Sequence, residues 1–158
     1  MKRTLWTLAL TAIVLISVPA AFAFDLTVVA YNVESDSDTD PAIVAQDIQD
    51  IPQSHLWALV EVDTPDLETY RAAIGQNFTL IEGNTGIRSG PDDRLAIVFD
   101  PTVLEQIGQT QELSAAGGSR HPLLAKFRVI ATSDEFWFVV NHLQRGRDHR
   151  PVRAVLTF

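Results

Sequence analysis

The sequence contains no cysteine among its 158 residues, so it has neither a disulfide framework nor a cysteine zinc site. Basic residues are also few, with 12 Lys and Arg against 20 Asp and Glu and a formal net charge of −8. This balance disfavours a protein that coats nucleic acid through bulk electrostatics, because such a protein needs a basic face. The hydrophobic fraction of 46% is ordinary for a globular protein, and the length fits one domain.

The first 23 residues have the three parts of a secretory signal peptide. Residues 1–3 form a basic start, an uncharged apolar run covers residues 5–18, and Ala21-Phe22-Ala23 supplies small residues for a signal peptidase. We expect cleavage after Ala23 and a secreted or periplasmic location. The alternative is an uncleaved membrane anchor, because the uncharged stretch 4–24 is long enough to span a bilayer.

Cleavage would leave one domain over residues 24–158. Two of the twelve basic residues would be removed and all twenty acidic ones kept, so the net charge would become −10. Without disulfides, the stability of an exported domain must come from core packing or from a metal.

Hydrophobic patterns in this domain predict a mixed α/β (α+β) fold. Helical spacing is found after Asp40, a candidate N-cap, and before Gly75, a candidate C-cap, and predicts helices over residues 41–51 and 65–74. Apolar, β-branched runs predict strands over residues 25–33, 56–62, 78–81, 95–99, 123–130 and 136–143. At least six strands for two helices indicate sheets that are only partly covered.

Asn32 and Glu61 each end a predicted buried strand. An amide oxygen and a carboxylate at strand ends can both bind a hard cation such as Mg²⁺. A polar residue at the end of a buried strand is costly unless it is paired, so its presence asks for a reason. The alternative is that each residue simply marks the point where its strand reaches solvent.

His142 ends the most apolar strand, and Arg120 precedes another. A histidine can serve as a general acid or base near neutral pH, and an arginine can bind a phosphate through two hydrogen bonds. The alternatives are a core histidine bonded to a backbone carbonyl and a solvated arginine.

Five short segments follow one another in order along the chain. They are Val29-Ala-Tyr-Asn-Val-Glu34, Ala58-Leu-Val-Glu-Val62, Arg94-Leu-Ala-Ile-Val-Phe99, Arg120-His-Pro-Leu-Leu124 and Val139-Val-Asn-His-Leu143. In this order they resemble the motifs of the endonuclease/exonuclease/phosphatase superfamily, the deoxyribonuclease-like metal-dependent phosphodiesterases. The resemblance covers residues from about 24 to about 149. It implies a four-layer α/β sandwich, with two sheets face to face and helices outside.

The resemblance also implies a role for each candidate residue. Glu61 would be the principal ligand of Mg²⁺ (or Mn²⁺), and Asn32 would help to orient the phosphate or the metal. Arg120 would contact a substrate phosphate, and His142 would act as the general acid for the leaving oxygen. In this chemistry the cation neutralises the phosphate while an activated water attacks phosphorus in line. A bound cation also lets an acidic protein bind an anion.

Two later motifs of the superfamily, Gly-Asp-x-Asn and a terminal Ser-Asp-His or Asp-His, are not found. Asp148-His149 has suitable residue types, but it comes early and in a basic loop. Beyond it the resemblance implies a helix, in which Pro151 suits the first turn. We therefore expect an incomplete sandwich that lacks its C-terminal part, through a shifted reading frame near residue 150 or as a genuine short protein. Its strands should expose apolar faces.

Two functions from different classes remain after this comparison. The first is an exported, Mg²⁺-dependent phosphodiester hydrolase, impaired in this chain because the pair that activates water is missing. The second is a non-catalytic remnant or binding module, and an exported metal-binding protein outside the superfamily is a third interpretation. Export favours extracellular DNA or a lipid headgroup as the phosphodiester substrate.

A cluster of basic residues lies near the end of the sequence and consists of Arg145, Arg147, Arg150 and Arg153. These side chains could contact a phosphate backbone, or they could lie on a solvated helix.

Overall fold

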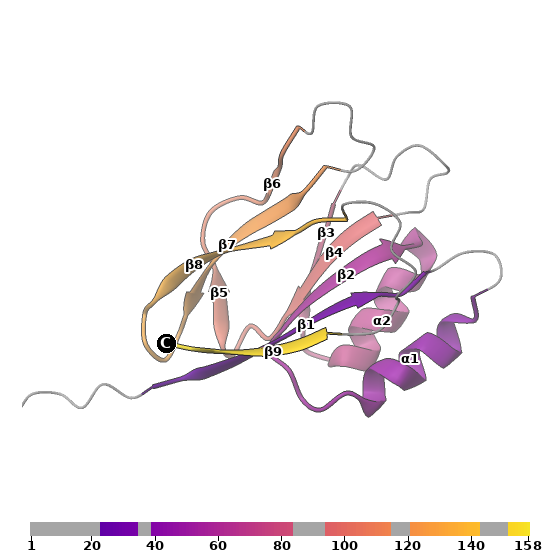
Figure 1. The fold of residues 1–158 in the computed structure, drawn as a ribbon, viewed down its shortest axis with the longest axis horizontal. Coiled ribbons are helices and arrows are strands. Elements are labelled where there is room, and N and C mark those ends of the chain that lie inside the picture. The colour runs from indigo at the N-terminus through magenta and orange to yellow at the C-terminus, as the bar shows by residue number, and fades with distance from the viewer. Residues whose placement is uncertain (1–22, 35–38, 84–93, 115–120, 143–151) are drawn as a thin grey trace, which may run out of the picture.

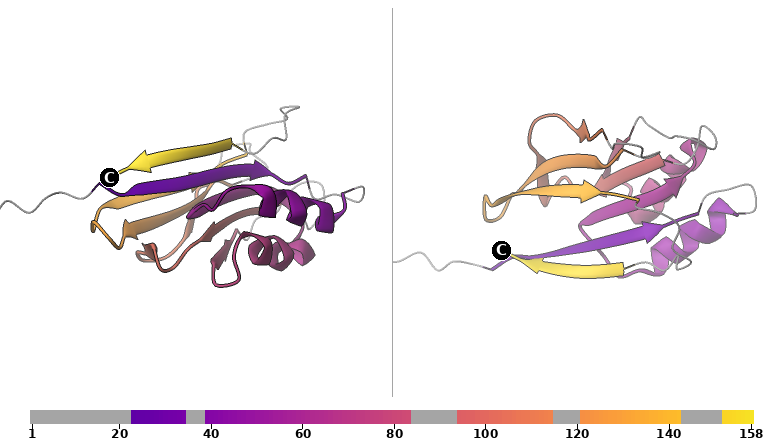
Figure 2. Two further views of the ribbon diagram at one scale, coloured as in Figure 1. Left: turned by 90° about the horizontal axis from the view of Figure 1, so that it is seen from below. Right: turned by 45° about the horizontal axis from the view of Figure 1, so that its top comes forward.

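The computed structural model describes residues 23–34, 39–83, 94–114, 121–142 and 152–158. Two β-sheets pack together, and two helices lie against the larger one (Figure 1, Figure 2). The elements are β1 (Asp25–Asn32), α1 (Pro41–Asp50), β2 (Leu56–Val62), the 3₁₀ turn η1 (Thr64–Asp66), α2 (Leu67–Ile74), β3 (Thr79–Glu82), β4 (Arg94–Phe99), β5 (Leu104–Gln106), β6 (Gln111–Glu112), β7 (Leu123–Val129), β8 (Glu135–Val140) and β9 (Val152–Thr157).

Neither helix in the described residues has the length and apolar character needed to cross a membrane. The predicted signal peptide, apart from Ala23, lies outside the described residues, so its cleavage and export stay predictions.

Local sequence signals explain both helices. The Asp40 carboxylate accepts a hydrogen bond of 2.9 Å from the Ala42 amide, and Pro41 occupies the first turn of α1. Helix α2 follows η1 and ends where the Gly75 amide donates to the Arg71 carbonyl at 3.0 Å. Both predicted helices are therefore confirmed, with small shifts at their ends.

The larger sheet, sheet A, has the strand order β3-β4-β2-β1-β9. Strands β1 and β2 are parallel, with Asn32 beside Val60, while the other neighbouring pairs are antiparallel. Both faces of sheet A are buried, one against the helices and one against the smaller sheet. This arrangement brings the carboxyl ends of β1 and β2 to the same end of the sheet.

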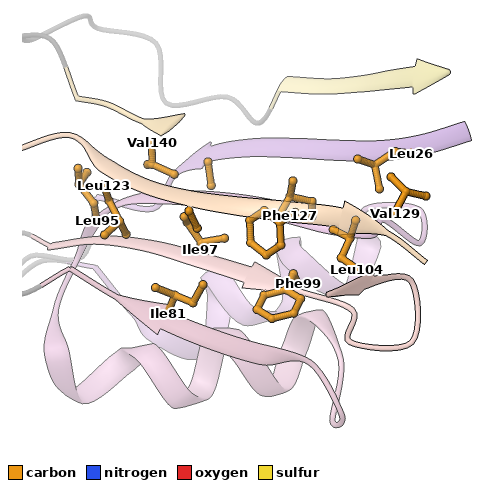
Figure 3. Packing of buried hydrophobic residues seen from close by; sticks show 13 residues of the cluster. Leu26, Ile81, Leu95, Ile97, Phe99, Leu104, Leu123, Phe127, Val129 and Val140 are labelled. Atoms are coloured by element: carbon orange, nitrogen blue, oxygen red, sulfur yellow. The ribbon is translucent and has the colours of Figure 1, made fainter. Parts of the chain in front are cut away.

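The core between the two sheets fixes their relative position. Phe127 of β7 packs against Phe99 of β4 with ring centroids 5.0 Å apart, and Ile97 lies in the same cluster (Figure 3). Burial of apolar surface and close packing hold the sheets together. The end of β8 is thereby held close to β2 and β4 of sheet A.

The smaller sheet, sheet B, orders β5-β7-β6, with β8 also paired to β7. Its outer face carries an ion pair of 2.7 Å between Arg128 and Glu135, and it exposes Trp137 by 51% and Val139 by 48%. The described residues thus form three layers of a four-layer arrangement. The expectations of an incomplete α/β sandwich and of exposed apolar side chains are confirmed on this face.

The expectation of a helix after Pro151 was wrong. Val152–Thr157 instead forms β9, which pairs antiparallel with β1 from Val152 beside Ala30 to Thr157 beside Asp25 (Figure 1). The physical reason is that β1 would otherwise be an edge strand with unpaired backbone groups, and β9 satisfies them.

Strands β5 and β6 were not predicted either, because segments of three and two residues carry too little pattern.

Candidate functional site

Asn32 is the last residue of β1, at the end of sheet A. Its side-chain Oδ1 accepts a hydrogen bond of 3.0 Å from the backbone amide of Glu34, whose φ is +45°. Because this oxygen accepts, the other end of the amide carries the N–H₂ donors. Asn32 can therefore donate to an anionic oxygen while its Oδ1 stays tied to its own loop.

Tyr31, the preceding residue, points to the helix-side core. Burial raises the pKa of its hydroxyl, and the Asp47 carboxylate of α1 raises that pKa further. The phenol is therefore neutral at physiological pH. It supports the end of β1 by packing, on the face opposite to the one that Asn32 borders.

Glu61 lies near the end of β2, next to the residue that pairs with Asn32. Its φ is +58°, which is uncommon for a residue with a side chain, and the β2–β4 register shifts at this point. The side chain is 20% exposed. A partly buried carboxylate on a strained backbone is a pattern typical of functional sites.

His142 follows the end of β8 by two residues and is 11% exposed. Its Nε2 lies 3.1 Å from the Glu61 Oε1, so an N–H at this nitrogen can donate to the carboxylate. This contact joins the two sheets at one end of the core between them. The structure thus pairs His142 with a carboxylate.

Three of the four predicted site residues, Asn32, Glu61 and His142, thus border the same end of the sandwich. Arg120 lies outside the described residues, so its contact with a phosphate stays a prediction. Asp148 and His149 also lie outside them.

The sequence interpretation gave Glu34 no role, although its amide holds Asn32 in place. The signal that could have revealed it is the Asn-x-Glu spacing. Asn side chains often hydrogen-bond the backbone two residues on.

Arg94 and Glu82 form a second pair at this end of sheet A. Their side chains are 2.8 Å apart, and the Arg94 Nη1 also donates to the Gly83 carbonyl at 3.1 Å. Arg94 pairs with Val62 in the ladder, on the helix-side face of the sheet. Its guanidinium thus stabilises the β3–β4 end of the sheet.

The donor set fits a divalent cation that keeps most of its water ligands. The described residues hold no group of three or more His, Asp or Glu side chains that could cage an ion. Mg²⁺ in proteins commonly binds through one or two carboxylates, together with waters and substrate phosphates. Glu61, with the predicted second ligand Asn32 beside it, would therefore suit Mg²⁺ or Mn²⁺.

Comparison with solved structures shows which fold this arrangement belongs to. D. rerio TDP2 in complex with a single-strand DNA product matches with a TM-score of 0.62 and 13% identity, over 78% of this chain and 48% of that one. An endonuclease/exonuclease/phosphatase family protein from Bacteroides thetaiotaomicron matches with 0.59 and 15%, over 75% and 51%. A mannosyl-6-phosphatase from the same organism matches with 0.57 and 16%, over 72% and 50%.

No protein-family model and no curated protein matches the chain. The matched region is about half of each of these solved chains. Over that half, the chain has an endonuclease/exonuclease/phosphatase-like fold.

Proposed function

We propose that this chain is an exported, Mg²⁺-dependent phosphodiester hydrolase of the endonuclease/exonuclease/phosphatase type, with its activity impaired in this chain. The observation that carries the proposal is the 3.1 Å contact of Glu61 with His142 between the two sheets, beside the strand end that bears Asn32. A carboxylate, an amide and an imidazole at one strand end supply a cation ligand, an anion donor and a proton donor.

Each residue has a separate task in this proposal. Glu61 would hold the Mg²⁺ or Mn²⁺, which when bound neutralises phosphate charge and lowers the pKa of a bound water. Asn32 donates its amide N–H₂ to a phosphate oxygen, an orientation fixed by the Glu34 amide. His142 would supply a proton to the leaving oxygen. Its Nε2 lies 3.1 Å from the Glu61 Oε1 in the structure, so this nitrogen would exchange the carboxylate for the leaving oxygen when substrate and cation bind.

The choice of substrate rests on charge and on the predicted signal peptide. A chain with a net charge of −8 gains little from general attraction to a polyanion, so a bound cation must mediate the contact. Export brings the chain to extracellular DNA or to lipid headgroups, both of which are phosphodiesters. D. rerio TDP2 was solved with a DNA product, so this type of sandwich accommodates DNA in at least one solved neighbour.

A second candidate function, non-catalytic binding of a cation and a phosphoester, also has support. Within the part of the chain that the structure describes, no group of three or more His, Asp or Glu side chains could hold an ion, and Glu61 is the carboxylate beside His142. A module that binds a cation through Glu61 and a phosphoester through Asn32, without activating a water, would use the same residues.

Hydrolysis of bis(p-nitrophenyl) phosphate by the purified chain tests both functions. We expect slow turnover, in keeping with an impaired hydrolase. It should require Mg²⁺ or Mn²⁺, be abolished by EDTA and fall by about 100-fold or more in Glu61→Gln. Glu68→Gln is the matched control, because Glu68 is 70% exposed and forms its ion pair with Arg71 on α2.

Saturable Mn²⁺ binding without turnover would support the binding module. Neither binding nor turnover would refute both functions.

A further inference from the structure

The faces of β2 alternate regularly until Val60. Leu56 and Ala58 belong to the cluster between the sheets, whereas Trp57 and Leu59 belong to the helix-side cluster. Side chains in a strand alternate with a period of two. Continued alternation would place the side chain of residue 61 on the helix side, together with those of Trp57 and Leu59.

One extra residue interrupts this alternation. Val60 pairs with Leu95 and Val62 pairs with Arg94, which are consecutive residues of β4, so the register shifts by one residue at Glu61. Val62, which is completely buried, fills the helix-side position that residue 61 would otherwise take. Glu61 is therefore the extra residue of a β-bulge, and its side chain can turn toward sheet B.

The bulge carries a cost that a regular strand would avoid. Glu61 has a φ of +58°, a left-handed conformation that strains any residue with a Cβ. In regular register its carboxylate would instead lie across from Arg94 on the helix side. A regular strand would therefore place the Glu61 carboxylate opposite the Arg94 guanidinium without a left-handed backbone.

We propose that this bulge is a positioning device, in which Val62 occupies the helix-side position so that Glu61 reaches the end of the core and meets His142. The 3.1 Å contact with His142 is the result of this turn. This role of the bulge rests on the proposed function, because the binding of a cation and a phosphoester is what requires the Glu61 side chain on the sheet B side. Val62 acts through Glu61 and is a positioning residue.

Shortening β2 by one residue, so that Glu61 falls into regular register opposite Arg94, tests this role. In a chain lacking Val62, with Glu61 kept, we expect Mn²⁺ affinity by calorimetry to fall at least tenfold, as in Glu61→Gln, although every carboxylate is retained. Val62→Ala is the matched control, since it removes buried side-chain volume without shortening β2. Its folded molecules should keep the affinity of the wild type, and so should Val62→Ile.

A deletion variant that binds Mn²⁺ as well as the wild type would overturn the proposal. So would a loss of affinity in Val62→Ala equal to that in the deletion variant.

Thermal unfolding of Glu61→Gly and Glu61→Ala gives a second test that needs neither the metal nor the deletion variant. Both variants lack the carboxylate, but only glycine adopts a left-handed backbone without strain. We expect Glu61→Gly to melt at a higher temperature than Glu61→Ala. Ala58→Gly, at a regular position of β2, should instead melt below the wild type.

If Glu61→Gly melted at the same temperature as Glu61→Ala, or at a lower one, the left-handed bulge at position 61 would be refuted. A wild-type chain that binds no Mn²⁺ would refute the proposed function, and the order of the glycine and alanine midpoints would still decide whether the bulge exists.

Discussion

Two histidines border opposite ends of β2, and they have different partners. His55 precedes β2, and its Nδ1 accepts a hydrogen bond of 3.0 Å from the Thr27 amide of β1. His142 lies near the other end of β2, and its Nε2 lies 3.1 Å from the Glu61 carboxylate. His55 thus replaces a backbone acceptor inside one sheet, while His142 joins two sheets through a titratable group.

The partner of a histidine therefore says more about its role than its burial does. His55 completes backbone pairing, since its own amide also donates to the Thr27 carbonyl at 2.9 Å. Its accepting Nδ1 carries no proton, so the ring holds a fixed tautomer. His142 has a partner that can also bind a cation, and such a pair performs chemistry that a backbone group cannot.

The largest expected effect comes from replacing the histidine at the candidate site. His142→Ala should lower hydrolysis of bis(p-nitrophenyl) phosphate by about 100-fold or more, because general acid catalysis contributes about 10² to 10⁴. The side chain is only 11% exposed and contacts Glu61, so some loss of stability is expected as well, and turnover is therefore compared per folded molecule. A large loss of stability with unchanged turnover would reverse the comparison and make His142 structural.

Weakening the core between the sheets should disturb the contact of His142 with Glu61 more than the hydrogen bond of His55 with Thr27. Phe127→Ala should cost about 3–5 kcal/mol in the free energy of unfolding, because Phe127 is fully buried between the sheets. It should also weaken Mn²⁺ binding, since His142 and Glu61 come from different sheets. The Thr27–His55 bond lies within sheet A and should persist, with slow exchange of the Thr27 amide.

Urea unfolding and hydrogen exchange measure both effects. Ile43→Ala is the control, as Ile43 is exposed on α1. Loss of protection at Thr27 in Phe127→Ala would contradict the independence of the two ends.

Replacing the other histidine should give the opposite result to His142→Ala. His55→Ala should lower the free energy of unfolding by about 1–3 kcal/mol, because it removes the acceptor of the Thr27 amide, a group that is almost fully buried. Turnover per folded molecule should stay unchanged. A fall in turnover comparable to that of His142→Ala, measured on folded protein, would contradict the assignment.

The smallest effect should come from an exposed carboxylate that also joins two strands. Hydrogen bonds from Lys126, and then from Arg128, lower the pKa of Glu135 below its ordinary value. The folded pKa is depressed, so Glu135 stabilises the fold above its unfolded pKa and loses this effect as the pH falls through the folded pKa. Glu135→Gln should therefore be slightly less stable than the wild type at pH 7.

The difference between Glu135→Gln and the wild type should shrink as the pH falls below the ordinary pKa of glutamate, and it should vanish below the lowered pKa of the folded state. Urea unfolding over this pH range provides the measurement. A difference that persists unchanged in acid would show that Glu135 acts by packing and not by charge.

Local signals allowed part of the fold to be predicted from the sequence. Asp40 and Pro41 mark the start of α1, and Gly75 marks the end of α2, because caps depend on neighbouring residues only. The positions of Asn32 and Glu61 at strand ends were also predictable, because both follow long apolar runs. Their closeness required the parallel pairing of β1 and β2, which no local pattern reveals.

Non-local pairing explains what the sequence could not predict. The alternation of β2 places residue 61 on the helix side, and only the register with β4 reveals the bulge at Glu61. Strand β9 pairs with β1 across more than a hundred residues, so no local pattern could distinguish it from a helix. The contact of Glu61 with His142 depends on how the two sheets pack, which sequence spacing does not encode.

A Mn²⁺ titration of the wild-type chain and of Glu61→Gln by calorimetry tests the central claim most directly. The account predicts one saturable site in the wild type and at least a tenfold weaker site in Glu61→Gln, while Glu68→Gln binds as the wild type does. Equal binding by the wild type and Glu61→Gln, or no binding by the wild type, would contradict it.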